Sequence, residues 1–177
     1  MGRNVELKAR VHDLEALGAR VISLGATGPE MLVQIDTFFI APSGRLKLRE
    51  FEDQTGELIH YRRPDTTGPK LSEYFRTAVP SCAALREILA QSLGVQATVR
   101  KRRAVFILGS TRIHLDDVQS LGTFIEFEVV LRDGQSVAEG HDVALGLLNA
   151  LSIPNADLIA TAYVDLILER DRQRSLT

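Results

Sequence analysis

The sequence predicts an α+β fold built on a closed or nearly closed, mainly antiparallel β-barrel of eight strands with flanking helices. Eight stretches alternate polar and apolar residues with the period of a strand. Most of them are joined by connections too short for a parallel crossover, which favours antiparallel pairing. One face of several strands is charged, which is typical of a barrel with a wet, charged lumen. A length of 177 residues suits a single domain over 1–177.

The first half of the chain predicts five strands and one helix. The helix, at 13–24, has apolar residues at helical spacing and ends at Gly25. Asp53-Gln54-Thr55-Gly56 forms the turn of a hairpin between the third and fourth strands. The five strands are expected at 3–10, 31–39, 44–53, 56–63 and 70–78.

The second half predicts three strands and three helices. Ser81 is a suitable N-cap for the first of these helices, and Pro154 separates the other two. The strands are expected at 95–108, 111–118 and 122–131, and the helices at 81–93, 136–151 and 155–170. The terminal helices carry leucines that suit either the core or the surface of a homodimer, namely Leu147, Leu148, Leu151 and Leu158.

Composition limits the classes of function. The formal net charge is −2 and the pI is about 6.1, so nothing indicates broad binding to nucleic acid or to an anionic membrane. The single cysteine, Cys82, cannot form a disulfide framework or a thiolate metal site, and we interpret it as a small packing residue. The N-terminus has no apolar signal region, and the apolar runs are too short to span a bilayer. We therefore expect a cytoplasmic protein.

Acidic residues share one face of the last strand. Glu126 and Glu128 are two residues apart, so both side chains point the same way. Two neighbouring carboxylates repel unless a cation lies between them. Their oxygens are ligands for hard cations, and Mg²⁺ typically uses one or two carboxylates together with substrate phosphates. This pair therefore predicts a site for a divalent cation.

Basic residues share a face of other strands. Arg45, Lys47 and Arg49 line one face of the strand at 44–53. Four more strands carry charged faces, with Glu6 and Lys8, with His60 and Arg62, with Lys101 and Arg103, and with Arg112, His114 and Asp116. Arginine forks fit phosphate oxygens, and lysine adds a point charge. Each face taken alone also fits simple solvent exposure, but the sorting of acids and bases onto different strands favours a metal-bound polyphosphate ligand.

Several segments carry a resemblance to a known family, and their order and spacing together are specific. They are Asn4-Val5-Glu6-Leu7-Lys8, Gln34-Ile35-Asp36-Thr37-Phe38-Phe39, Gly44-Arg45-Leu46-Lys47-Leu48-Arg49-Glu50, Tyr61-Arg62-Arg63-Pro64, Lys101-Arg102-Arg103, His114-Leu115-Asp116 and Leu121-Gly122-Thr123-Phe124-Ile125-Glu126-Phe127-Glu128. Over nearly its whole length the chain resembles the CYTH superfamily of triphosphate tunnel metalloenzymes. Within it, the chain is most similar to the class IV adenylyl cyclase branch.

The resemblance implies a role for each charged row. It implies that Mg²⁺ or Mn²⁺ is held by Glu6, Asp116, Glu126 and Glu128. It implies that a triphosphate is bound by Lys8, Arg45, Lys47, Arg49, Arg62, Lys101, Arg103 and Arg112. Among these, it implies direct roles in catalysis for Lys8, Arg49, Lys101 and Arg103.

Three residues near these rows need separate interpretation. Asn4 stands where the family signature has its first Glu, and an amide oxygen can coordinate a metal but brings no charge. Asp36 is expected to hold a turn or to pair with an inward-facing base rather than to bind metal. His114 lies beside Leu115 on a strand, and we expect it to be structural rather than a general base.

Three functions stay open at this point. The leading hypothesis, which the resemblance favours, is a cyclase that converts ATP to cyclic AMP and pyrophosphate. A triphosphatase acting on inorganic, thiamine or nucleoside triphosphate is the first alternative, because charge recognition dominates both reactions. A non-catalytic protein that binds polyphosphate or nucleotide is the second, and Asn4 is its only support.

Overall fold

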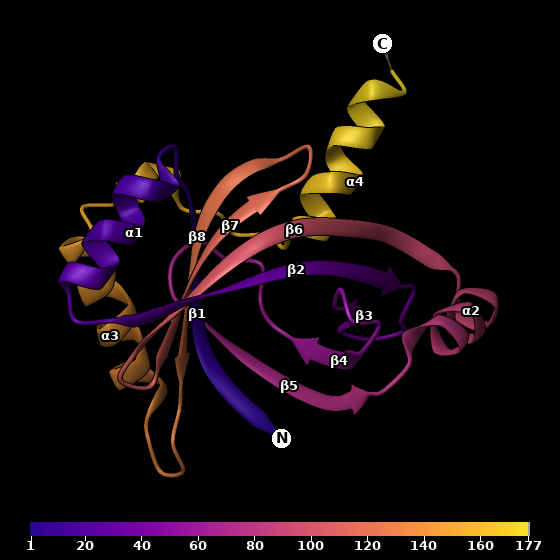
Figure 1. Cartoon of the computed structure of the whole chain (residues 1–177), viewed down its shortest axis with the longest axis horizontal. Helices are drawn as coiled ribbons and strands as arrows, with labels where there is room; N and C mark the ends of the chain where they lie inside the picture. Colours follow the sequence, from indigo (N-terminus) through magenta and orange to yellow (C-terminus); the bar gives the residue numbers. More distant parts are fainter. Residues whose placement is uncertain (177) are drawn as a thin grey trace.

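The computed structural model describes residues 1–176, and in it eight antiparallel strands close into a barrel. The order of strands around the barrel is β1-β5-β4-β3-β2-β6-β7-β8. Helices α1 and α3 lie together on one side of the barrel, α2 lies at the opposite side, and α4 projects away from it (Figure 1). The predicted fold class is therefore confirmed.

Most element boundaries agree with the sequence expectations to within two residues. The strands are Gly2–Arg10 (β1), Thr27–Phe39 (β2), Arg45–Glu50 (β3), Gly56–Arg62 (β4), Lys70–Val79 (β5), Val95–Leu108 (β6), Thr111–Val118 (β7) and Gly122–Val130 (β8). The helices are Leu14–Ser23 (α1), Cys82–Leu93 (α2), Val137–Ala150 (α3) and Tyr163–Arg174 (α4).

The last helix begins later than the sequence indicates, so the expected helix at 155–170 is wrong at its start. Only a 3₁₀ turn forms at Asn155–Asp157. Beyond it the backbone is tied to β1, because Leu158 forms a bridge with Ala9 and the Ile159 amide donates to the Lys8 carbonyl at 2.8 Å. This pairing holds the segment extended, and α4 starts only at Tyr163.

Strand β2 also begins earlier than expected, at Thr27, because its first residues pair with β6. Gly28 makes this close approach possible. Its φ is +111°, and a Cβ at this position would lie 2.7 Å from the Val105 carbonyl oxygen. A larger residue would push the two strands apart at this end of the barrel.

The apolar core lies outside the barrel, between its outer face and the helices. Strands β1, β7 and β8 pack against α1 and α3 in a cluster that includes Leu147, Leu148 and Leu151, so these leucines belong to the core. Leu158 packs against the same cluster. A second cluster lies under α2, where buried Cys82, the first residue of that helix, packs with Phe39, Leu48 and Val79, as expected. None of the helices within 1–176 has the length and apolar character of a membrane span.

A third apolar cluster closes one end of the barrel. It joins strand residues that include Phe38, Val99 and Phe124 to α4 through Tyr163 and further residues of that helix. Because the helices cover the outer apolar faces, the alternate residues of each strand point into the lumen. The charged faces seen in the sequence are therefore candidates for the interior.

Candidate active site

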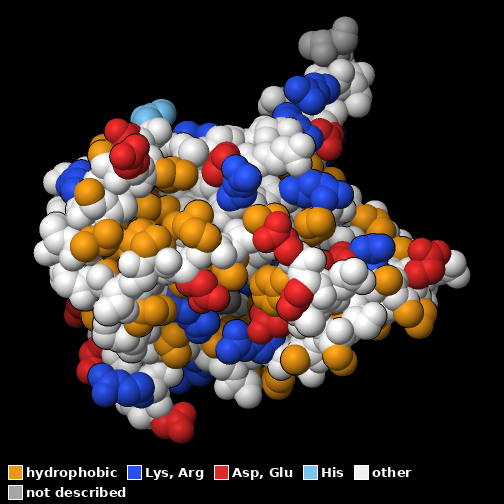
Figure 2. All heavy atoms as spheres, in the orientation of Figure 1, with side chains coloured by type: hydrophobic (Ala, Val, Ile, Leu, Met, Phe, Trp, Pro, Cys, Tyr) orange, Lys and Arg blue, Asp and Glu red, His pale blue; other side chains and the backbone are white. Residues whose placement is uncertain are grey.

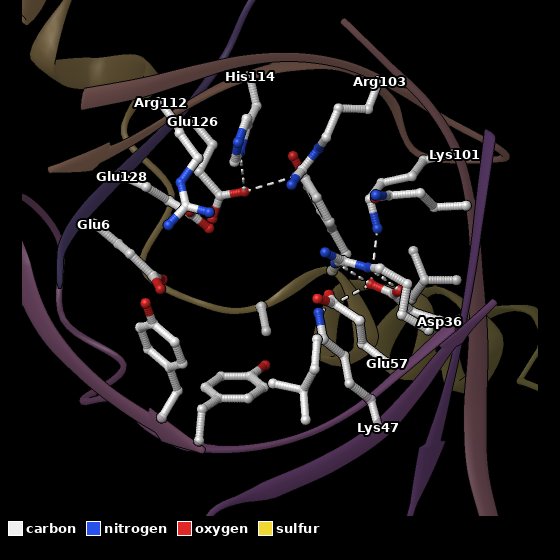
Figure 3. Close-up of a pocket in the computed structure, with 18 of the residues that line it drawn as sticks. Glu6, Asp36, Lys47, Glu57, Lys101, Arg103, Arg112, His114, Glu126 and Glu128 are labelled. Atoms are coloured by element: carbon white, nitrogen blue, oxygen red, sulfur yellow. Dashed lines mark hydrogen bonds and ion pairs between the residues drawn. The ribbon is translucent and has the colours of Figure 1, made fainter. Parts of the chain in front are cut away.

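The barrel encloses a cavity of about 360 Å³ that is lined by residues of β1–β8 and by the start of α4. Acidic and basic side chains meet around the hollow in Figure 2, and Figure 3 looks into it. The neighbouring strands β3, β2 and β6 contribute Lys47, Arg49, Lys101 and Arg103. The neighbouring strands β7, β8 and β1 contribute His114, Glu126, Glu128 and Glu6. We call these two sides the basic wall and the acidic wall.

A single carboxylate organises the basic wall. Asp36 accepts hydrogen bonds from Lys47 Nζ at 3.0 Å, from Arg49 Nε and Nη2 at 2.8 and 2.9 Å, and from Lys101 Nζ at 2.7 Å. Burial alone would raise the pKa of Asp36, but the charges of Arg49, Lys101 and Lys47 lower it well below its ordinary value. The expectation that Asp36 pairs with an inward-facing base is confirmed, with three bases rather than one.

The lysines of this wall are easier to deprotonate than free lysines. Burial lowers the pKa of Lys101 to about 7, although the charge of Asp36 acts in the opposite direction. Burial, followed by the charge of Arg49, also lowers the pKa of Lys47. One carboxylate thus compensates only part of the charge of three cations, and an anionic ligand would supply the rest.

Glu126 is the centre of the acidic wall. Arg103 Nη2 donates to Glu126 Oε2 at 2.8 Å, and Lys8 Nζ lies 3.6 Å from Oε1. Burial would raise the pKa of Glu126, but the charges of Lys8 and Arg103 together with the neighbouring His114 lower it well below its ordinary value. His114 Nδ1 lies 3.7 Å from Glu126 Oε2, which is too far for a hydrogen bond.

Two more carboxylates face each other across β1 and β8. Glu6 and Glu128 are direct partners in the register, a position at which like charges destabilise a sheet. Each one has its own cation, since Arg63 Nη1 donates to Glu6 Oε2 at 2.6 Å and Arg112 Nε lies 3.3 Å from Glu128 Oε2. The two arginines therefore offset the repulsion within this pair.

Asp116 lies beneath the cavity wall rather than on it. Its carboxylate is fully buried and accepts hydrogen bonds from Arg103 Nε and Nη2, both at 2.6 Å, and from the Tyr163 hydroxyl at 2.8 Å. The Tyr163 ring also lies 3.8 Å from Lys8 Nζ. In this structure Asp116 holds Arg103 and Tyr163, and its assignment as a metal ligand stays a prediction.

Two of the predicted phosphate-binding arginines do not line the cavity. Arg45 Nη2 bonds to Asp65 at 2.7 Å and to Asp165 of α4 at 2.9 Å, which keeps its guanidinium at the end of the barrel. Arg62 is exposed, and its Nη2 donates to the Ser43 hydroxyl at 3.2 Å. The structure therefore does not bring these two residues together with the other predicted phosphate ligands.

The error at Arg62 comes from the orientation of β4. The sequence places His60 and Arg62 on the charged face, but the face that lines the cavity carries Glu57, Ile59, Tyr61 and Arg63. Leu58 packs outward against the cluster under α2, and this contact fixes which face points in. Arg63, which the sequence analysis missed, is the inward-facing arginine. Outward packing of Leu58 is the signal that would have identified it.

The acidic wall offers donors that suit Mg²⁺ or Mn²⁺. Glu6, Glu126 and Glu128 supply carboxylate oxygens, and buried Asn4 Oδ1 has no hydrogen-bond partner among the described residues. Hard oxygen ligands of this kind are those that Mg²⁺ prefers. Within 1–176, however, no three His, Cys, Asp or Glu side chains are gathered as a formed metal site. The donor set therefore fits a divalent ion. In this structure each of the three carboxylates is paired with a lysine or arginine side chain instead.

Comparison with known families agrees with this geometry. The family model described as "CYTH domain" matches residues 2–163. The chain belongs to the CYTH family. The match takes in all eight strands and ends at Tyr163, the first residue of α4.

Individual relatives of this CYTH chain are distant in sequence. A Methanocaldococcus jannaschii protein that carries the name of a candidate adenylate cyclase is 24% identical, over 92% of this chain and 97% of the relative. The structure of the PH1012 protein from Pyrococcus horikoshii superposes with a TM-score of 0.83 at 21% identity, covering 92% of this chain and 98% of that one.

A third similar structure comes from Hippeastrum. Its TM-score is 0.59 at 15% identity, with 92% of this chain and 91% of that chain covered. That protein is described as a candidate adenylyl cyclase with a dominant triphosphatase activity. At these identities the two structural neighbours show the shared fold.

Proposed function

We propose that this chain is a divalent-metal-dependent phosphoryl-transfer enzyme that acts on a triphosphate, most closely a cyclase that converts ATP to cyclic AMP and pyrophosphate. One observation carries the proposal. Glu126 and Glu128 line the same cavity as Lys47, Arg49 and Lys101, on walls formed by different strands. A polyphosphate and a cation require this separation of opposite charges within one site.

The basic wall would bind the phosphates. Asp36 occupies one N–H donor of Lys47 and one of Lys101, and an ammonium group has three. The remaining donors are free to point at phosphate oxygens while Asp36 holds the side chains in place. Arg63 adds two buried donors, Nε and Nη2, which have no hydrogen-bond partner among the described residues.

The acidic wall would hold Mg²⁺ or Mn²⁺ through Glu6, Glu126 and Glu128, with the Asn4 amide oxygen beside them. When bound, such an ion neutralises negative charge on phosphate oxygens. The ion pairs of Glu6 with Arg63 and of Glu128 with Arg112 would open at the same time, which releases both arginines toward the phosphates.

In the proposed reaction the ribose 3′-hydroxyl attacks the α-phosphorus. The hydroxyl passes its proton to water as the new P–O bond forms, and the bond to pyrophosphate breaks. Catalysis of phosphoryl transfer depends mainly on positioning and on stabilising charge. Arg103 is suited to this role because Asp116 and Glu126 fix its guanidinium from two sides. Lys8 lies next to Glu126, deeper in the cavity, and would bind the departing pyrophosphate.

A triphosphatase is the second candidate, and the Hippeastrum structure, described as having a dominant triphosphatase activity, favours it. The same walls would bind the substrate, and water rather than a ribose hydroxyl would attack at the terminal phosphate. Product analysis separates the two reactions. Cyclic AMP with pyrophosphate indicates the cyclase, and orthophosphate indicates the hydrolase.

The deciding experiment follows the products formed from ATP, thiamine triphosphate and tripolyphosphate with Mg²⁺ or Mn²⁺. We expect Glu126→Gln to lower kcat by about 10²–10³-fold, the range typical for removing one stabilising group. Asp117→Asn is the matched control, because Asp117 is exposed on β7 outside the cavity. If ATP gives neither cyclic AMP nor pyrophosphate, the cyclase proposal fails. If no triphosphate is turned over, the enzyme proposal fails as a whole.

A further inference from the structure

The cavity is closed at one end and open at the other. Along β6, the exposed fraction of the inward-facing residues rises from 1% at Val99 through 4% at Lys101 and at Arg103 to 43% at Ile107. Along β2, Phe38, Asp36 and Gln34 are buried, Leu32 is partly exposed and Glu30 is exposed. The start of β2 and the end of β6 are therefore the exposed ends of the two strands. They pair with each other, so both lie at one mouth of the cavity.

The closed end is built from apolar side chains and from the C-terminal segment. Phe38, Val99 and Tyr163 pack together there. In Figure 3 the segment that leads to α4 passes behind the labelled side chains. Lys70 fastens this segment, since its Nζ donates to the carbonyls of Thr66 at 2.7 Å and Ala160 at 2.5 Å. A chain of phosphates can therefore enter only from the mouth.

The mouth carries three aliphatic side chains just beyond the charged residues. We call Leu32, Val105 and Ile107 the collar. The three residues lie on the paired strands β2 and β6, where Leu32 is opposite Arg103 and Val105 is opposite Glu30. Among the described residues, none of the three belongs to an apolar cluster of the core. Folding therefore does not account for aliphatic groups that face a wet, charged lumen.

We propose that the collar is the subsite for the organic group of the substrate, so that the chain selects a nucleoside triphosphate over inorganic tripolyphosphate. This inference rests on the proposed function. The terminal phosphate enters first and reaches the charged walls near Lys8 and Lys101, because the far end is closed. The α-phosphate then lies toward the mouth, and the nucleobase contacts Val105 and Ile107. Apolar contact with a base requires no hydrogen-bond donor, which fits aliphatic side chains.

Arg112 supports the same placement. It lies on β7 directly opposite Ile107 in the register, next to the collar, and its guanidinium faces Glu128 at 3.3 Å. A guanidinium can stack on an aromatic base as well as bind phosphate. The boundary between the collar and the charged walls therefore coincides with the boundary between base and phosphates in the proposed complex.

The test compares ATP and tripolyphosphate as ligands of one protein by isothermal titration calorimetry, with a divalent ion present. We expect wild type to bind ATP more tightly than tripolyphosphate. In Ile107→Ser we expect the Kd for ATP to rise about tenfold, which corresponds to about 1.4 kcal/mol, with the Kd for tripolyphosphate unchanged. Val33→Ser is the matched control, because Val33 lies on β2 beside Leu32 but faces outward and is 37% exposed.

Each outcome separates the collar from the proposed function. If Ile107→Ser leaves ATP binding unchanged, or weakens both ligands equally, the collar is not the base subsite and the triphosphate site still stands. If wild type binds neither ligand, the proposed function fails and the collar proposal fails with it. Leu32→Ser provides a second variant on the other strand, with the same expected difference between the two ligands. Thermal melting of each variant confirms that the barrel is folded.

Discussion

The two walls of the cavity hold their charges in different ways. On the basic wall, Lys47, Arg49 and Lys101 share one carboxylate, that of Asp36. On the acidic wall, carboxylates are held by separate cations, as Glu6 is by Arg63. Removal of the Asp36 carboxylate would leave three cations unpaired. Removal of the Glu6 carboxylate would leave one cation, Arg63, unpaired. The basic wall is therefore preorganised for an anion, and the acidic wall must exchange partners when a ligand binds.

The largest effect that follows from this difference is on stability. We expect Asp36→Asn to lower the free energy of unfolding by about 3–5 kcal/mol, the range for breaking a buried ion pair by removing one partner. For Glu128→Gln we expect at most about 1 kcal/mol, because the side chain of Glu128 is 21% exposed and faces one arginine 3.3 Å away. Urea unfolding of both variants measures the contrast.

A ligand sharpens this prediction. Tripolyphosphate should raise the melting temperature of Asp36→Asn more than that of wild type, because phosphate oxygens then supply the anion that the three cations have lost. Equal losses of stability in the two variants would contradict the shared role of Asp36. So would a melting temperature of Asp36→Asn that tripolyphosphate does not change.

The next effect is a pH dependence that belongs to the basic wall. Burial lowers the pKa of Lys101 to about 7 in the free protein, so the ammonium is charged below that pH and loses its proton above it. Bound phosphate favours the charged form. Above pH 7 Lys101 must take up a proton when the triphosphate binds, so affinity should fall as the pH rises. We expect KM for the triphosphate to increase about tenfold between pH 7 and 8.5.

Lys101→Arg is the control for this titration. An arginine keeps its charge throughout the range, so the variant should show a nearly flat KM between pH 7 and 8.5. The measurement is the pH profile of KM for both proteins in the same buffers. If both profiles rise in parallel, the titrating group lies on the substrate or elsewhere in the site, and Lys101 is not responsible.

Much of this arrangement could be predicted from the sequence because strand periodicity is local. Glu6 and Lys8, Lys101 and Arg103, and Glu126 all face the lumen as their two-residue spacing indicates. Spacing shows which residues share a face, but it does not show which face is inside. On β1 and β8 one face is clearly apolar, and the choice is easy.

On β4 the same rule fails, because both faces mix polar and apolar residues. Ile59 and Tyr61 point inward although they are apolar, while His60 points outward and bonds to the Ser43 carbonyl at 2.9 Å. Only the contact of Leu58 with the cluster under α2 decides the orientation. Tyr163 could not be placed either, since its position depends on the long-range pairing of Ile159 with Lys8 that delays the start of α4.

The smallest effect concerns Tyr163, which links the closed end to the acidic wall. Its hydroxyl donates to Asp116 at 2.8 Å and its ring lies 3.8 Å from Lys8 Nζ. Tyr163→Phe removes only the hydrogen bond, and we expect a loss of about 1 kcal/mol in unfolding free energy with kcat nearly unchanged. Tyr163→Leu also removes the ring beneath the ammonium, a contact worth about 0.5–2 kcal/mol.

These two variants separate packing from positioning. Burial already lowers the pKa of Lys8, and loss of the ring removes a contact that favours its charged form, so the pH at which Lys8 loses its proton should fall in Tyr163→Leu. We therefore expect the alkaline limb of the kcat profile to move to lower pH in Tyr163→Leu and to stay in place in Tyr163→Phe. If the two profiles coincide, the ring does not hold Lys8, and α4 serves only to close the barrel. A shift confined to Tyr163→Leu would mean that the acidic wall depends on a segment that follows the last strand, whereas Asp36 and its three cations lie entirely within β2, β3 and β6.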